Sequence, residues 1–270
     1  MFDAGRYWIT EVAYAKSDDA RELLIEITAT NAGEDADTLH VLPTAWFRNT
    51  WSWETGAPKP VMKLAGDATV DIDHPFLGPL ELLADAADDG AIANSVTPTP
   101  LFCENETNAE RLFGSRSETP YPKDGINDHV VGGAATVNPG QFGTKCSFWY
   151  QLTVQPGATA TIRLRLRPQP PAGTNGPFDK KDFDLVMRRR RAEADEFYQA
   201  LTPPQASADE ALVMRQAFAG MLWSKQFYHY DVATWLDGDP AQPAPPPQRE
   251  LNRNARWRNF DAFDILSMPD

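Results

Sequence analysis

The 270-residue chain is predicted to be mainly β, with C-terminal helices. Two observations support this fold class. Short segments with apolar residues at every second position, separated by Gly, Pro and Asn turns, recur between residues 7 and 167. After a Pro-rich segment at 168–177, apolar residues recur at helical spacing instead. A run of strands followed by a run of helices indicates separate layers or domains.

The first strands are predicted at Tyr7–Ala15 and Leu23–Thr30. In the second strand, apolar residues alternate with Glu26 and Thr28, which is the pattern of a half-buried strand. Residues 39–47 are largely apolar on both sides of an extended chain, so this strand is expected to be covered on both faces. Shorter strands are expected at 68–72, 80–83 and 101–103.

The clearest strand pair is Lys145–Gln155 and Ala158–Arg167, with Pro156-Gly157 as the turn between them. In the second strand, leucine and isoleucine alternate with Arg163, Arg165 and Arg167. This alternation predicts one face in the core and an arginine face exposed to water.

Helices are predicted from Phe183 to Leu201 and again after Pro204, where Ser207 and Glu210 form the pattern of a capping box. The chain therefore divides into a β-sandwich domain (1–170), a linker with a connecting helix (171–206) and a helical part (207–270). Two helices cannot cover their own apolar sides. We therefore expect an exposed apolar surface on them and self-association through it.

Composition and charge narrow the functional class. A net charge of −13 argues against a nucleic-acid partner, and the basic run Arg188–Arg191 is interpreted as a solvated helix face because acidic residues follow it. The start of the chain lacks the pattern of a signal peptide, and no apolar run is long enough to span a membrane. Two cysteines, Cys103 and Cys146, form no disulfide framework and favour a reducing compartment, the cytoplasm.

No cofactor or metal site is expected, because there is no Gly-rich phosphate loop and the four histidines are scattered. Arg48–Trp53 is more informative, since a guanidinium, an amide, hydroxyls and two indoles fall within six residues. An indole offers a flat apolar face and one donor, which suits a sugar ring. The competing interpretation is that both tryptophans pack in the core. Tyr121–Gly133 is interpreted as an ordered functional loop.

Several stretches, read together, resemble one known family. They include LHVLPTAWFRNTWSW, CENETNAERLFG, KDGINDHVVGG, VNPGQFGTKCSFWYQLTV, ADEFYQAL, EALVMRQAFAGMLWSKQFYHYDV and the closing DILSMPD. These stretches resemble bacterial proteins of glycoside hydrolase family 63, the glucosidase and mannosylglycerate-hydrolase-like group. The resemblance implies a β super-sandwich followed by an (α/α)6 toroid. It also implies that 1–170 is N-terminally incomplete and that 207–270 is only the first part of the toroid.

The resemblance implies hydrolysis of α-glycosidic bonds with inversion, by an acid and a base that the family places beyond the position of Asp270. No catalytic residue is therefore predicted within this chain, which is expected to be inactive alone. Residues expected to contact a carbohydrate ligand are Arg48, Asn49, Trp51, Trp53, Asn105, Asp124, Asp264 and Ser267. Packing, loop ordering or helix capping remains an alternative for each of them. A carbohydrate-binding or structural sandwich without catalysis is the second hypothesis for the whole chain.

Overall fold

The computed structural model describes residues 5–88, 95–170, 178–240 and 242–267. The chain forms two compact units. Unit 1 comprises Met1–Trp51 and Gly56–Arg188, and unit 2 comprises Ser52–Thr55 and Arg189–Asp270. The predicted mainly β fold is confirmed, and its sheets are antiparallel. Most of the predicted Pro-rich linker, residues 171–177, lies outside the described residues.

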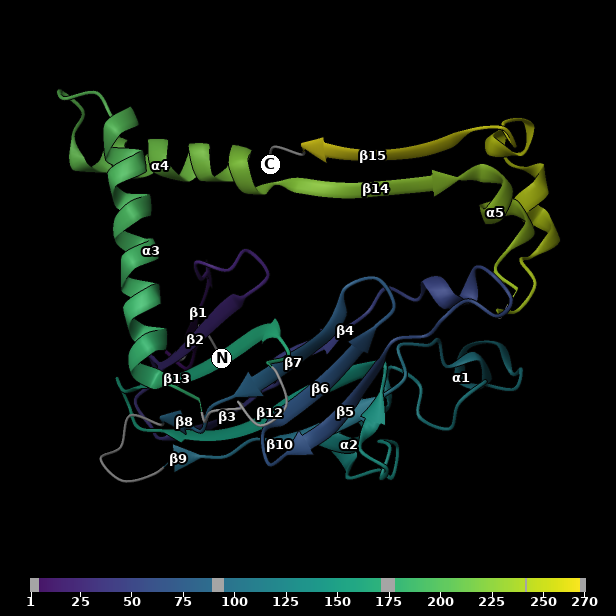
Figure 1. Cartoon of the computed structure of the whole chain (residues 1–270), viewed down its shortest axis with the longest axis horizontal. Coiled ribbons are helices and arrows are strands. Elements are labelled where there is room, and N and C mark those ends of the chain that lie inside the picture. Colours follow the sequence, from purple (N-terminus) through teal and green to yellow (C-terminus); the bar gives the residue numbers. More distant parts are fainter. Residues whose placement is uncertain (1–4, 89–94, 171–177, 241, 268–270) are drawn as a thin grey trace. The chain divides into compact units, whose positions relative to one another are not determined.

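The larger sheet of unit 1 has nine strands among the described residues, and all its pairings are antiparallel (Figure 1). Its main path runs β1 (Trp8–Lys16), β2 (Leu23–Asn31), β13 (Thr159–Pro168), β7 (Gly78–Ala84), β6 (Thr69–His74), β5 (Val61–Gly66) and β11 (Phe142–Gly143). Two short strands, β8 (Ala87–Asp88) and β9 (Ser95–Val96), extend from β13.

The smaller sheet has four strands in the described part of the chain: β10 (Thr99–Cys103), β12 (Lys145–Val154), β3 (Asp37–Val41) and β4 (Thr44–Trp46). Strands β3 and β4 pair with different halves of β12, with Pro43 between them. The prediction that residues 39–47 form one strand covered on both faces is wrong. Proline interrupts the strand, and the Trp46 side chain is 60% exposed.

The core of unit 1 lies between these two sheets. On β12 every second residue is buried, and this row comprises Cys146, Phe148, Tyr150, Leu152 and Val154. The row packs in one cluster with inward side chains of the larger sheet, such as Met62, Val70, Ile72, Leu82 and Ile162. This is the period-two burial expected when two sheets enclose a shared core.

The pairing predicted between residues 145–155 and 158–167 is wrong. Both strands form, but β12 belongs to the smaller sheet and β13 to the larger one. The turn at Pro156-Gly157, with Gly157 at φ +70°, carries the chain from one sheet to the other. A turn signal shows where the chain reverses, but not whether the next strand stays in the same sheet.

The arginine face of β13 is not exposed to water, contrary to the prediction. The side chains of Arg163, Arg165 and Arg167 are largely buried beneath ion pairs. Their partners are, in order, Asp184 (3.0 Å), Glu22 (3.0 Å) together with Asp182, and Glu81 (2.6 Å). Asp182 and Asp184 lie in the first turns of helix α3 (Lys180–Leu201), the element that follows β13 in the sequence.

Phe183 and Met187 of α3 are buried against Ala15 and Leu24 on the same side of the larger sheet. The helix therefore covers this face with a small apolar cluster beside the ion pairs. Because the acidic partners and the apolar residues lie on α3 and on other segments outside β13, the alternation within β13 could not reveal that its arginines are covered.

Two short α-helices lie in the described connections of unit 1. Helix α1 spans Ala109–Phe113, and helix α2 spans Gly125–Gly132. The prediction of a loop over residues 121–133 is therefore wrong. Gly125 allows α2 to lie against its neighbours, because a Cβ there would be 2.2 Å from the Thr136 carbonyl oxygen. Gly133 ends the helix in the left-handed conformation at φ +66°.

Unit 2 contains the end of α3, helix α4 (Ala208–Trp223) and a two-stranded ribbon of β14 (Lys225–Asp231) and β15 (Asp261–Ser267) (Figure 1). The predicted capping box at Ser207 and Glu210 is confirmed. Between the ribbon strands lie α5 (Val232–Asp237) and the 3-10 helices η3 (Pro247–Leu251) and η4 (Arg253–Arg256). The ribbon was not predicted, because the whole of 207–270 was expected to belong to a helical domain.

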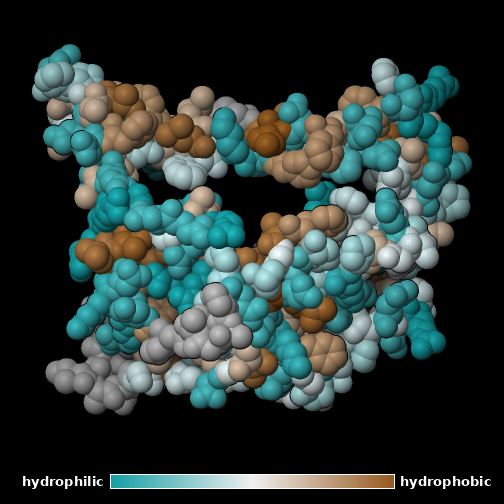
Figure 2. All heavy atoms as spheres, in the orientation of Figure 1, coloured by the Kyte–Doolittle hydropathy of each residue, from teal (hydrophilic) through white to brown (hydrophobic). Residues whose placement is uncertain are grey.

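The hydrophobic residues of unit 2 are mostly exposed. Among its described hydrophobic residues, only Tyr198, Val232 and Leu236 are buried. Figure 2 shows hydrophobic side chains gathered over α4 and the ribbon. Exposed examples are Leu212, Val213, Met221, Leu222, Trp223, Phe227, Phe263 and Ile265. The exposed apolar helix surface expected from the sequence is thus present.

Candidate functional site

The connection after β4 carries four of the predicted ligand-binding residues. The first part, through the 3-10 helix η2 (Thr50–Ser52), is tied to unit 1 by Trp51. The Trp51 indole donates to Glu106 Oε1 at 3.2 Å, and its ring lies 5.5 Å from the Lys59 ammonium. The N–H donor of Trp51 and its ring both interact with other residues of the protein. Trp51 is therefore a weaker candidate for contacting a sugar than the sequence suggested.

Lys59 links the carboxylates of Glu104 and Glu106. Its ammonium lies 2.9 Å from Glu104 Oε2 and 2.7 Å from Glu106 Oε1, and both carboxylates are largely buried. Burial alone lowers the pKa of Lys59, but hydrogen bonds to Glu106 and Glu104 outweigh it and the net shift is upward. The lysine therefore stays charged and holds both carboxylates in place. These two ion pairs are suited to ordering the segments that carry Lys59, Glu104 and Glu106.

Asn105 joins the ends of two strands. Its side-chain amide donates to the Phe47 carbonyl at 2.7 Å, and its backbone N–H donates to Thr144 Oγ1 at 2.7 Å. These bonds hold the segment after β10 against the end of β4. The structure thus brings Asn105 close to the connection that contains Arg48 and Asn49, and gives it an ordering role.

Asp124 lies in a surface network just before α2. It accepts from the Asn108 amide at 3.1 Å and from Arg111 at 2.9 Å, and Arg111 also contacts Asp128 at 3.0 Å. The hydrogen bond to Asp124 raises the pKa of Arg111. Backbone bonds from Glu104 to Tyr121 and from Lys123 to Glu106 place this network beside the Asn105 segment.

Trp53 belongs to unit 2, where it meets the ribbon. Its indole packs edge-on against His229 of β14, with ring centroids 5.7 Å apart. The His229 ring lies 5.1 Å from that of Phe263, and Phe263 lies 5.0 Å from Phe227. His229 Nε2 is 3.4 Å from a carboxylate oxygen of Asp261. We call Trp53, Phe227, His229, Asp261 and Phe263 the ribbon cluster.

Strand register explains why these side chains share one face. His229 pairs with Phe263, and Asp231 pairs with Asp261, so residues at alternate positions point to the same side. Asp264 pairs with Tyr228 and points to the opposite side. The predicted site residues Trp53 and Asp264 are therefore separated by the ribbon, and the side chain of Ser267 lies outside the described residues.

Sequence reasoning missed Phe227, His229 and Phe263 as site residues. A weak signal was present, since aromatic residues and a histidine fill positions 227–230 and Phe263 lies between two aspartates. It was obscured because the helical pattern of α4 runs directly into β14.

The ribbon cluster has the chemistry of a sugar-binding surface. It combines aromatic rings, an imidazole and a carboxylate, and Phe227 and Phe263 are exposed. Among the described residues, no cluster of histidine, cysteine and acidic side chains could hold a metal ion. Asp231, next to the cluster, caps α5; its hydrogen bond with Thr234 keeps the pKa of Asp231 below its usual value.

No protein-family profile matches the chain. The chain is similar to the uncharacterized protein YMR196W of Saccharomyces cerevisiae, with 32% identity over an alignment of 282 residues. The alignment covers 95% of this chain and 26% of the yeast protein, so the chain spans about a quarter of the relative's length. In the described part of the chain, no helix is both long and apolar enough to cross a membrane.

Proposed function

We propose that this chain is part of an inverting glycoside hydrolase that acts on α-glucosides or related glycosides. The ribbon cluster carries the proposal, because within unit 2 Trp53 packs against His229, and His229 in turn contacts Phe263 and Asp261. Aromatic faces stack on the C–H face of a sugar, while Asp261 and His229 offer partners for its hydroxyl groups.

Unit 2 is proposed to be the first part of an (α/α)6 toroid, and unit 1 to be its β super-sandwich. Exposed apolar side chains on α4 and on the ribbon support this proposal, because surfaces of this kind are normally covered by further structure. The alignment also spans only a quarter of the yeast relative. Without further structure, the same surface would promote self-association of the chain.

The chain by itself is proposed to lack both catalytic carboxylates. Inversion requires an acid and a base separated widely enough to admit a water molecule. The carboxylates of the candidate site have other partners. Glu104 and Glu106 bind Lys59, while Asp261 contacts His229 on an aromatic surface. We propose that the acid and base are supplied by residues beyond Asp270.

We further propose that the protein functions in the reducing cytoplasm. Cys103 and Cys146 are free and buried, and register places them on opposite faces of the β10–β12 pair, where they cannot bond to each other. Burial raises the pKa of Cys103 to about 11 and that of Cys146 to about 12, so both thiols stay protonated.

The test compares this chain with the longer polypeptide encoded by its gene. We expect the longer polypeptide to hydrolyse aryl α-glucosides and to release the β-anomer first, observed by proton NMR. This chain alone should give no turnover but should bind maltooligosaccharides by NMR titration. Trp53→Ala should abolish that binding, whereas Trp257→Ala, an exposed tryptophan outside the ribbon cluster, should leave it unchanged.

Binding by this chain together with an inactive longer polypeptide would favour a carbohydrate-binding module instead. Retention of the α-anomer would contradict the inverting mechanism. A gene that encodes no residues beyond these would overturn the proposal of a larger enzyme.

A further inference from the structure

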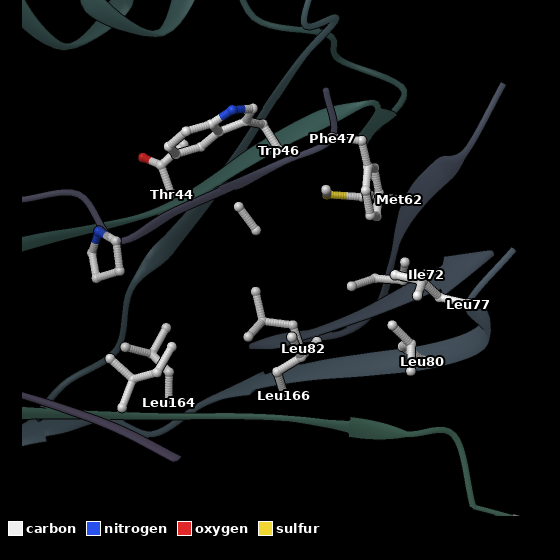
Figure 3. Close-up of a pocket in the computed structure, with 13 residues that line it drawn as sticks. Thr44, Trp46, Phe47, Met62, Ile72, Leu77, Leu80, Leu82, Leu164 and Leu166 are labelled. Atoms are coloured by element: carbon white, nitrogen blue, oxygen red, sulfur yellow. The ribbon is translucent and has the colours of Figure 1, made fainter. Parts of the chain in front are cut away.

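The two sheets of unit 1 differ in width. The larger sheet has nine strands among the described residues and the smaller has four, with β3 and β4 sharing one row beside β12. Part of the inward face of the larger sheet therefore has no described strand opposite it. A cavity of about 280 Å³ lies there, beside β4 (Figure 3).

The cavity is almost wholly apolar. Its floor is formed by inward side chains of the larger sheet, and Figure 3 shows Leu80, Leu82 and Leu166 there, with Phe47 beside Met62. Its border includes Trp46 and Leu77, whose side chains are both mostly exposed. Apolar surface at the edge of a sandwich is normally covered, because leaving it in water costs about 25 cal/mol per Å².

The border formed by β4 is a free strand edge. Phe47 N–H donates to the Thr144 carbonyl, and Phe148 N–H donates to the Pro43 carbonyl. Residues 43, 45 and 47 therefore direct their backbone groups toward β12. The N–H and C=O groups of Thr44 and Trp46 point the other way, and no described strand pairs with them.

We propose that an additional β-strand pairs with Thr44–Trp46 and inserts alternate apolar side chains into this cavity. The strand is a segment of the same, longer polypeptide. This assignment rests on the proposed function, in which the chain is a section of a larger hydrolase, and on the yeast relative, about three-quarters of which lies outside the alignment.

A strand fits this place better than other occupants. A small apolar molecule would fill the cavity but would give no hydrogen-bond partners to the backbone donors and acceptors of Thr44 and Trp46. Addition of a strand satisfies the backbone edge and the apolar cavity together. A second copy of the chain could pair its own β4 with this edge. The inward side chains of that β4 would not be able to fill the cavity, because they already line the cavity of their own copy.

Hydrogen exchange tests the proposal with an internal control. The amides of Thr44 and Trp46 should exchange freely in this chain and should be slowed about 100-fold or more in the longer polypeptide. The amide of Phe47, bonded to β12, should be protected in both. Equal exchange of Thr44 and Trp46 in the two proteins would overturn the proposal, and protection that rises with the concentration of this chain would assign the edge to a second copy.

A matched pair of variants distinguishes the contribution of the β4 backbone edge from that of the Trp46 side chain. Trp46→Pro removes an N–H that makes no bond to β12, while Trp46→Ala removes only the indole. In this chain the two variants should melt at the same temperature. In the longer polypeptide Trp46→Pro should melt at a lower temperature than Trp46→Ala, and equal melting there would contradict the added strand.

The outcomes also separate this inference from the proposed function. Hydrolysis of aryl α-glucosides by a longer polypeptide with a freely exchanging edge would refute the added strand alone. A protected edge in a longer polypeptide without hydrolysis would refute the enzyme alone.

Discussion

Units 1 and 2 differ in how far each buries its own apolar surface. In unit 1 two sheets and the start of α3 enclose a continuous core and a row of covered ion pairs. In unit 2 the helix α4 and both ribbon strands carry large exposed apolar side chains. An isolated two-stranded ribbon is marginal in water, so the comparison indicates that unit 1 holds its structure by itself and unit 2 depends on further contacts.

The largest expected difference in stability between the units comes from removing one aromatic ring in each of them. Phe148 is fully buried, and Phe148→Ala should destabilise unit 1 by about 3–5 kcal/mol. Phe263 is 70% exposed, and Phe263→Ala should cost about 1 kcal/mol or less. Urea unfolding followed by hydrogen exchange of each unit measures both. Comparable losses would show that unit 2 has a core of its own.

A smaller effect is expected from the covered ion pairs. Glu81 is 1% exposed and lies 2.6 Å from Arg167, so Glu81→Gln should cost about 3 kcal/mol by leaving the arginine without a counter-charge. Asp35→Asn at the exposed Arg6–Asp35 pair is the control and should cost less than about 1 kcal/mol. Equal costs in urea unfolding would mean that the α3 face is open to water.

The smallest effect concerns the start of α4 in unit 2. Ser207→Ala should weaken the helix by about 1 kcal/mol, and Ser207→Asp, which keeps a capping acceptor, should restore most of this loss. Circular dichroism of the helices during thermal unfolding measures the difference. If Ser207→Ala has no effect on unit 2 while Phe148→Ala unfolds it, the stability of α4 comes from unit 1.

The same cap predicts a pH dependence. Hydrogen bonds from the Ser207 backbone and side chain lower the pKa of Glu210 from its ordinary value of 4.5. A group with a lowered folded pKa adds stability above its unfolded pKa and loses it as the pH falls through the folded value. Protection of the first α4 amides should therefore fall below about pH 4.5, and this fall should be absent in Glu210→Gln.

The sequence predicted the elements of unit 1 better than their arrangement. Alternation and short apolar runs located β1, β2, β6, β7, β10, β12 and β13 within a few residues. The same patterns could not assign β12 and β13 to different sheets, because both carry apolar faces toward one core. For the candidate site, Trp53 was found from composition, whereas Phe227, His229 and Phe263 were not, since their shared face exists only in the register of β14 with β15.

The sequence by itself determined where strands alternate, where the capping box opens α4 and which residue types could meet a sugar, because these depend on neighbours in the chain. The tertiary structure alone decided that the β13 arginines are covered and that Trp51 is held by Glu106 while Trp53 reaches the ribbon. It also decided that no described strand pairs with the outer edge of β4. These outcomes depend on charges, rings and backbone groups brought together from distant segments, which local periodicity does not record.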